Sequence, residues 1–261
     1  MVMTHRSNGS VTSERRIRES IRSGHPFGNR LQERWHVDGK SGALRAGVFG
    51  ISDGLVSNLT LILGVAASGA AAHFVIVAGL AGLLAGAFSM AAGEYISMQI
   101  QRETFQYALR VEAAEIDLVP DAERRELVDI YTGRGIPIDT ALTLADQVME
   151  DPARALDVHA REELGLDPGQ LGSPVGAAMS SFLAFAVGAT VPLTPYLLFS
   201  DGAALIGAVI CGAIALAVVG GVMAHMTARY VAMGALRMLG LGMAAAAVTY
   251  GIGSLLGIAT G

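Results

Sequence analysis

Several features that would point to a soluble enzyme are missing from this sequence of 261 residues. Cys211 is the single cysteine and lies inside an apolar run, which excludes a disulfide framework. The chain has no phosphate-binding loop, so nothing indicates ATP-driven activity. His225 has no obvious serine or carboxylate partner, and no nucleophile stands beside a base and an orienting group. We therefore expect a protein that is not an enzyme.

Charge is also missing from long stretches, although 52% of the residues are hydrophobic and the mean hydropathy is +0.49. Runs of about 20 apolar residues match the thickness of a bilayer's hydrocarbon core, and only helices or closed barrels satisfy the backbone there. The sequence predicts an all-α membrane protein with five transmembrane helices, approximately at Ala46–Ala67, Phe74–Ile100, Val175–Phe199, Ala203–Met223 and Leu239–Ile258.

Basic residues are absent from two of the four predicted loops. Of the 18 Lys and Arg residues, nine precede the first span, seven lie in residues 101–172, and Arg229 and Arg237 separate the last two spans. With five spans these three segments share one side, which the positive-inside rule makes cytoplasmic. The N-terminal segment lacks the apolar region of a cleavable signal. Because arginine and alanine are abundant, we expect a prokaryotic plasma membrane.

These patterns divide the chain into four parts. Residues 1–45 form a basic cytoplasmic segment, 46–100 the first two spans, 101–172 an acidic cytoplasmic domain and 173–261 the last three spans. Proline and glycine divide the acidic domain into about three short helices. Gly50-x-x-x-Gly54 and Gly82-x-x-x-Gly86 permit close helix contacts, either within one chain or between two.

Two carboxylates fall within or at the edge of the first two spans. A carboxylate in hydrocarbon costs several kcal/mol and normally has a functional reason. Asp53 and Met90 are each about 12 Å deep on neighbouring antiparallel helices. Met90 and Glu94 are four residues apart and share a helix face. The three residues can line one cavity; alternatively, Glu94 extends to the interface and Asp53 caps a kink at Gly54.

The acidic domain contains sixteen of the 23 acidic residues and a repeated pair spacing. Glu112 and Glu115 are three residues apart, and Glu123 and Glu126 repeat that spacing after a break at Pro120. Four carboxylates on facing helices repel one another unless cations are bound, and such pairs form known di-metal sites. A third helix adds the remaining candidates, His159, Glu162 and Glu163. The alternative is that these helices merely present a solvated acidic face.

Ligand chemistry restricts the ion that such residues would bind. Carboxylate, imidazole and thioether together favour Fe(II) or Mn(II) over Ca(II) or Mg(II), while Cu(I) prefers more sulfur. Divalent transition metal ions and the lipid bilayer are the expected partners, with no organic cofactor. Nucleic acid is not expected, because the soluble block is acidic.

Two membrane segments resemble a known family. Residues 44–56, LRAGVFGISDGLV, and residues 89–97, SMAAGEYIS, are similar to the first-helix and second-helix signatures of the vacuolar iron transporter family. The four glutamates of the pairs and residues 161–166, REELGL, resemble its cytoplasmic metal-binding domain. The resemblance covers approximately residues 36–258.

The resemblance implies a five-helix homodimer with a pore lined by the first helices. It also implies export of Fe(II), often with Mn(II), from the cytosol in exchange for protons. Asp53, Met90 and Glu94 would lie in or near the translocation path, and the glutamates at 112, 115, 123, 126 and 163 would bind metal. His159-Ala160 departs from a Met-Glu pair of eukaryotic members, which leaves the number of ions and the metal preference open.

A second function from a different class also fits the sequence. A membrane-anchored metal sensor or storage protein would use the spans only to dimerise and the acidic domain to bind metal. The intramembrane Asp53 and Met90 favour transport, because an anchor needs no buried carboxylate.

Overall fold

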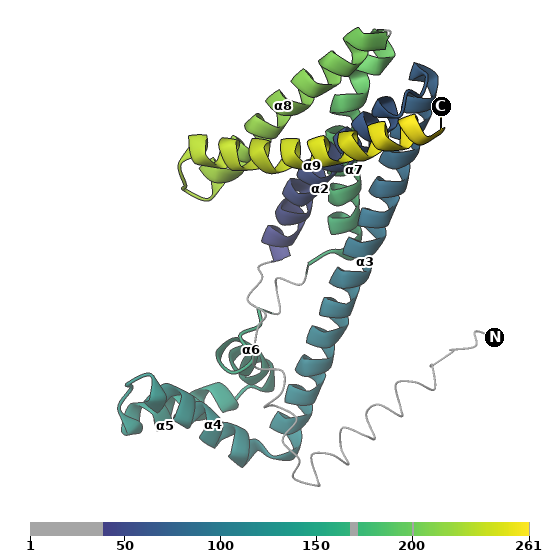
Figure 1. Cartoon of the computed structure of the whole chain (residues 1–261). Coiled ribbons are helices and arrows are strands. Elements are labelled where there is room, and N and C mark those ends of the chain that lie inside the picture. Colours follow the sequence, from purple (N-terminus) through teal and green to yellow (C-terminus); the bar gives the residue numbers. More distant parts are fainter. Residues whose placement is uncertain (1–38, 168–171, 200, 261) are drawn as a thin grey trace, which may run out of the picture. The chain divides into compact units, whose positions relative to one another are not determined.

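The structure is a computed structural model that describes residues 39–167, 172–199 and 201–260. Within these residues all regular structure is helical (Figure 1). Most of the N-terminal segment expected at 1–45 lies outside the described residues. The helices are α2 (Gly39–Ala67), α3 (Ala72–Leu118), α4 (Pro120–Gly133), α5 (Ile138–Met149), α6 (Pro152–Glu162), α7 (Pro174–Leu198), α8 (Asp201–Met226) and α9 (Val231–Thr260).

Five of these helices contain stretches long and apolar enough to cross a membrane, which confirms the predicted number of spans. The stretches lie in α2, α3, α7, α8 and α9. Helix α9 begins at Val231, about two turns before the expected Leu239, so Arg237 lies within a helix and not in a loop. An arginine six residues inside a helix can still reach the membrane interface with its long side chain. Pro192 and Pro195 lie inside α7 without ending it.

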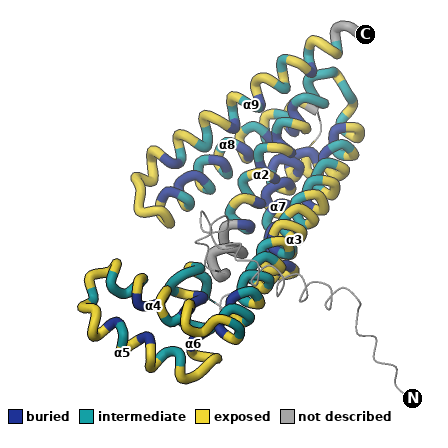
Figure 2. Tube along the Cα trace, turned by 90° about the horizontal axis from the view of Figure 1, so that it is seen from below, coloured by how far each residue is buried: buried dark blue, intermediate teal, exposed yellow. Residues whose placement is uncertain are grey.

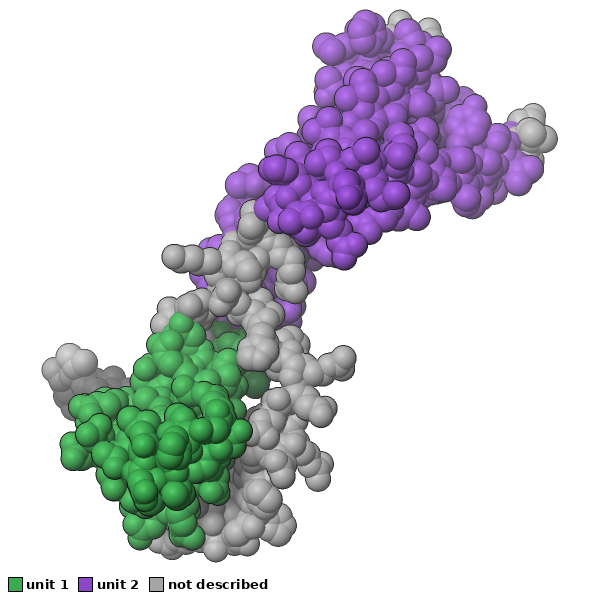
Figure 3. Space-filling view, turned by 90° about the vertical axis from the view of Figure 1, so that its left-hand side faces the viewer, with its two compact units in different colours: residues 1–38, 100–171 green, residues 39–99, 172–261 purple. Residues whose placement is uncertain are grey.

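The described residues form two compact units, coloured separately in Figure 3. The first contains the end of α3 from Ile100 together with α4, α5 and α6, and the second contains the remaining helices. Helix α3 contributes residues to both units as one continuous helix.

Proline and capping residues set the helix boundaries in the first unit. Pro120 and Pro152 occupy the first turns of α4 and α6, where a missing N–H costs little. Asp151 caps α6 by accepting a hydrogen bond of 3.0 Å from the Ala153 amide. Gly135 has φ +89°, a conformation that permits the turn between α4 and α5. Three short helices thus follow α3, as the sequence predicted.

A small apolar core and two ion pairs hold the short helices together. Leu127 and Val128 of α4 pack against Ala141 and Ala145 of α5. The Arg124 guanidinium binds the Asp146 carboxylate through two nitrogens, which connects α4 with α5. Arg134 pairs with Glu162 and connects the end of α4 with α6.

In the second unit, glycines allow α2 and α7 to pack backbone against backbone. A Cβ atom added to Gly54 would lie 2.2 Å from the carbonyl oxygen of Phe185, and one added to Gly188 would lie 2.2 Å from that of Ile51. A Cβ at Gly50 would meet the Ser181 carbonyl oxygen at 2.8 Å. The Gly50-x-x-x-Gly54 motif is therefore used for packing within the chain.

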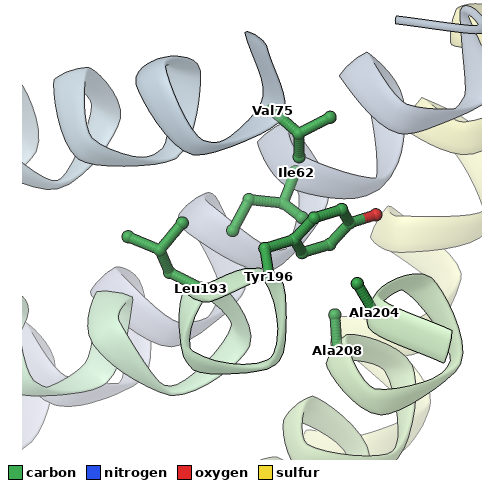
Figure 4. Close-up of a cluster of buried hydrophobic side chains, with 6 residues drawn as sticks. All are labelled: Ile62, Val75, Leu193, Tyr196, Ala204 and Ala208. Atoms are coloured by element: carbon green, nitrogen blue, oxygen red, sulfur yellow. The ribbon is translucent and has the colours of Figure 1, made fainter. Parts of the chain in front are cut away.

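Helix α3 uses its glycines differently, because they accept side chains. A Cβ at Gly82 would lie 2.4 Å from Leu61 Cδ2, and one at Gly86 would lie 2.1 Å from Phe185 Cζ. A cluster of buried residues from four helices also fills the space between α2, α3, α7 and α8, and Figure 4 shows its members: Ile62, Val75, Leu193, Tyr196, Ala204 and Ala208.

The outer faces of the apolar helices remain exposed in the isolated chain (Figure 2). On α8 a stripe of residues four apart has more than half of its surface exposed, namely Ile206, Ile210, Ile214, Val218 and Val222. Water would disfavour such a stripe, whereas lipid tails accommodate it, which agrees with an integral membrane protein.

The Gly54 contact predicts a sharp sensitivity to size. In Gly54→Ala the new methyl group would overlap the Phe185 carbonyl, and overpacking of this kind costs about 1–3 kcal/mol. We expect a lower thermal unfolding midpoint for the detergent-solubilised protein. Gly240→Ala is the control, because a Cβ at that exposed position of α9 meets nothing within 4 Å. Equal midpoints for the two variants would contradict the close approach of α2 and α7.

Candidate metal-binding sites

Four side chains converge inside the first unit. Glu112 comes from α3, Glu123 from the first turn of α4, and His159 from the last turn of α6. Glu163 follows at the end of α6, where its backbone N–H donates to the His159 carbonyl oxygen at 2.9 Å. One potential ligand atom from each lies within 4.8 Å of all the others. We call these four residues the Glu/His cluster.

The imidazole of His159 lies at the centre of the Glu/His cluster. Its Nδ1 atom is 3.1 Å from Glu112 Oε1, 3.5 Å from Glu163 Oε2 and 3.7 Å from Glu123 Oε2. His159 is fully buried, and Glu112 and Glu123 are 2% and 6% exposed. Three carboxylates therefore surround one imidazole in a site with little access to water.

Several atoms of the Glu/His cluster lack hydrogen-bond partners despite this proximity. They are both ring nitrogens of His159, Glu112 Oε1 and Glu163 Oε2. Buried polar groups are nearly always hydrogen-bonded, because leaving one unpaired costs about 1–3 kcal/mol. Unpaired oxygen and nitrogen atoms of Glu112, Glu163 and His159 could therefore serve as ligands of a cation.

Burial and mutual repulsion oppose ionisation of these carboxyl groups when no metal is bound. Desolvation, followed by the charges of Glu163 and Glu123, raises the pKa of Glu112 to about 9. Desolvation raises the pKa of Glu123 to about 7, although His159 opposes the shift. A divalent cation would reverse this balance by supplying the missing positive charge.

The donor set fits a divalent transition metal ion. Carboxylate oxygens with one imidazole nitrogen are ligands of the kind that Fe(II) and Mn(II) accept. The alternative interpretation is a solvated acidic face, whose side chains would be exposed. Glu112, Glu123 and His159 are buried, so this interpretation does not apply to them.

The remaining predicted ligands of the first unit are Glu115, Glu126 and Glu162. Partial burial and the charge of Glu163 raise the pKa of both Glu115 and Glu126, which places these two residues in its electrostatic neighbourhood. Glu162 instead pairs with Arg134. The structure thus groups four of the seven predicted ligands, puts two beside them and directs Glu162 to a structural ion pair.

The second unit contains a cavity of about 300 Å³ between α2, α3 and α7. Asp53 and Ser57 of α2 and Ser89 and Met90 of α3 line it, and Gly82 and Gly86 leave room for it. Asp53 and Met90, predicted from their depth in the spans, therefore share one cavity. Glu94, one turn beyond Met90, is not among the described residues that line it.

Asn58 also lines this cavity and was not among the residues selected from the sequence. The sequence did offer one signal, a polar side chain inside an apolar run. An uncharged amide in a span is weaker evidence of function than a carboxylate, because it is less costly to bury. Asn58 is 2% exposed and donates from Nδ2 to the Ala189 carbonyl oxygen at 2.7 Å.

Comparisons with known proteins identify the family of the chain. The family model described as the VIT family matches residues 44–254. A vacuolar iron transporter from Acanthamoeba castellanii is 37% identical over 222 residues, which cover 83% of this chain and 80% of that protein.

Two rice proteins are also similar. Vacuolar iron transporter 1 of Oryza sativa subsp. japonica is 30% identical over 78% of this chain and 82% of its own length. Vacuolar iron transporter homolog 1 of the same plant is 35% identical over 82% of this chain and 74% of its own length. The family model spans most of the sequence, and these relatives align along most of their own lengths. The chain therefore belongs to the VIT family.

Proposed function

We propose that this protein carries Fe(II), and also Mn(II), out of the cytosol across the membrane in exchange for protons. The observation that carries the proposal is the Glu/His cluster, in which buried atoms of Glu112, His159 and Glu163 lack hydrogen-bond partners. Relatives named iron transporters support iron as the transported ion. The metal is substrate in this scheme, and no organic cofactor takes part.

The Glu/His cluster collects the ion on the cytoplasmic side. Its carboxylates raise the local concentration of divalent cations, and Glu115 and Glu126 extend this negative field. This placement follows the distribution of basic residues, which assigns the acidic domain to the cytoplasm. A prokaryotic plasma membrane is the membrane that we propose on composition.

The ion then enters the cavity in the spans, where Asp53 and Met90 offer a carboxylate and a thioether. A proton from the far side neutralises the carboxylate and releases the metal, which couples metal exit to proton entry. Glu94 keeps its predicted place near this path, one helical turn from Met90.

A homodimer is the proposed assembly. Asp53 is exposed in the single chain, and so is Phe49 on the same helix, with 60% of its surface exposed. A carboxylate that faced lipid at this depth would cost several kcal/mol, so a second copy packed along α2 is a favourable way to cover it. The first helices would then line a shared pore.

Metal sensing or storage without transport is the second candidate function. It would use the Glu/His cluster alone. The cavity with Asp53 favours transport, because an anchor has no use for a carboxylate within its spans.

We expect His159→Leu to weaken Mn(II) binding by the detergent-solubilised full-length protein by more than about tenfold, since even outer-shell changes cost that much. Isothermal titration calorimetry measures the affinity. Glu162→Gln is the matched control, because Glu162 pairs with Arg134 outside the cluster. If the control weakened binding as strongly as His159→Leu did, the assignment of ligands would be wrong.

Mn(II) binding is expected to weaken as the pH falls from about 8.5 to 6. Without metal the pKa values of Glu112 and Glu123 are about 9 and about 7, so both groups gain protons over this range. These protons must leave before the ion binds, and each proton released changes the affinity by about tenfold per pH unit. Titrations in buffers of different ionisation enthalpy count the protons. A pH-independent affinity would contradict protonation of the cluster.

Asp53→Asn tests the coupling between metal and protons. The amide keeps the size of the side chain but can neither carry the negative charge nor exchange the proton. In proteoliposomes with a pH gradient, we expect metal-driven proton movement to disappear and Fe(II) uptake to fall by at least about tenfold. Undiminished uptake would remove Asp53 from the mechanism, and absence of uptake by the unmodified protein would favour sensing or storage.

A further inference from the structure

The side chain of Asn58 has a defined orientation inside the second unit. Its Nδ2 atom is 2.7 Å from the Ala189 carbonyl oxygen of α7. A carbonyl oxygen only accepts hydrogen bonds, so the amide nitrogen must face α7. The amide oxygen Oδ1 must then point away from Ala189, and this direction follows from the contact itself.

Oδ1 of Asn58 faces the cavity side of α3. A Cβ atom added to Gly82 would lie 3.1 Å from Oδ1, and both residues line the cavity of about 300 Å³. The oxygen is buried and has no hydrogen-bond partner. Because a buried acceptor without a partner costs free energy, a side chain held in this orientation calls for a reason beyond packing.

We propose that Asn58 Oδ1 is a ligand of the transported metal ion in this cavity, at a position beyond Asp53 and Met90. The proposal rests on the transport function proposed above and deepens it. Amide oxygens are hard, neutral ligands that suit Mn(II) and Fe(II), while the Met90 thioether is soft. Asn58 therefore adds affinity for hard ions without adding a group that takes up protons.

The position of Asn58 along α2 gives it a distinct place in the cavity. It lies five residues beyond Asp53, which is about 7.5 Å further along the helix axis. Gly82 lies opposite Asn58, two turns before Met90 on the antiparallel α3. The ion would therefore reach Asn58 after Asp53 and Met90 if it moves from the cytoplasmic start of α2.

The competing explanation is purely structural, in which Asn58 only connects α2 to α7 through Nδ2. Replacing the amide with a thiol separates the two roles, because loss of the Nδ2 connection affects all metals alike, whereas a change of ligand does not. Asn58→Cys offers a soft ligand at the same place. Ser181→Cys is the matched control, since Ser181 of α7 is also buried with an unpartnered hydroxyl but does not line the cavity among the described residues.

The experiment measures Mn(II) and Cd(II) uptake by proteoliposomes that contain the full-length protein. For Asn58→Cys we expect the KM for Mn(II) to rise about tenfold or more, while the KM for Cd(II) stays equal or falls. Ser181→Cys should have the same ratio of the KM for Mn(II) to the KM for Cd(II) as the unmodified protein. Asn58→Cys with an unchanged ratio of the two KM values would overturn the proposal and leave only the structural role.

A second measurement does not depend on transport or on normal uptake by the variants. Cd(II) is added to detergent-solubilised protein in which Glu112→Gln and Glu123→Gln disable the Glu/His cluster. Asn58→Cys should show an ultraviolet thiolate-to-Cd(II) charge-transfer band, and Ser181→Cys, which retains the native Cys211, should not. No band with Asn58→Cys overturns the proposal. If the unmodified protein transports neither metal, the proposed function fails, and the band alone decides the role of Asn58.

Discussion

The contact between α2 and α7 is the constraint on which the second unit depends. Gly54 and Gly188 let the two backbones approach to distances at which any side chain would overlap a carbonyl group. This approach brings Asn58 within hydrogen-bond distance of Ala189 and places Phe185 at the wall of the cavity. A wider spacing would separate these groups, so the chemistry of the cavity follows from the absence of two Cβ atoms.

The two sites differ in the number and burial of their carboxyl groups. In the Glu/His cluster, burial and repulsion raise the pKa values of Glu112 and Glu123, which favours their protonated forms when no metal is bound. A metal ion that enters must displace these protons, and its charge then favours the ionised carboxylates. In the cavity of the spans, most of the described lining groups are neutral, and Asp53 is the carboxylate among them. Under the proposed function, the first site would capture the ion and the second would let it pass.

Much of this architecture could be predicted from the sequence, because long apolar runs and proline boundaries are local signals. The five spans and the three short helices after α3 belong to this class. Asp53 and Met90 were found through their depth in the membrane. A helix rises by a constant distance per residue, so this depth follows from the residue number. Side-chain direction is different, because it depends on tertiary packing. Glu162 and Glu163 are adjacent in the sequence, and nothing in the sequence indicated that Glu162 would pair with Arg134.

Asn58 shows the same limit more clearly. Its backbone position was known from the span, but its importance depends on Ala189, which is 131 residues away in the sequence. The use of Gly50 and Gly54 also needed the structure, because the motif itself does not distinguish contacts within a chain from contacts between chains. The contacts of Asn58 and of the two glycines are all with α7, and the sequence did not indicate that α7 packs against α2.

The charge of the cavity affects how long an ion would stay in it. Among the described residues that line it, one carboxylate faces groups that carry no charge. One carboxylate would face a divalent ion there in the single chain, and two in the proposed dimer, whereas three carboxylates would surround an ion in the Glu/His cluster. Fewer carboxylates hold a divalent ion less firmly, which shortens its stay. A carrier needs brief occupancy at its centre, because an ion that is held too firmly there would stop every ion behind it.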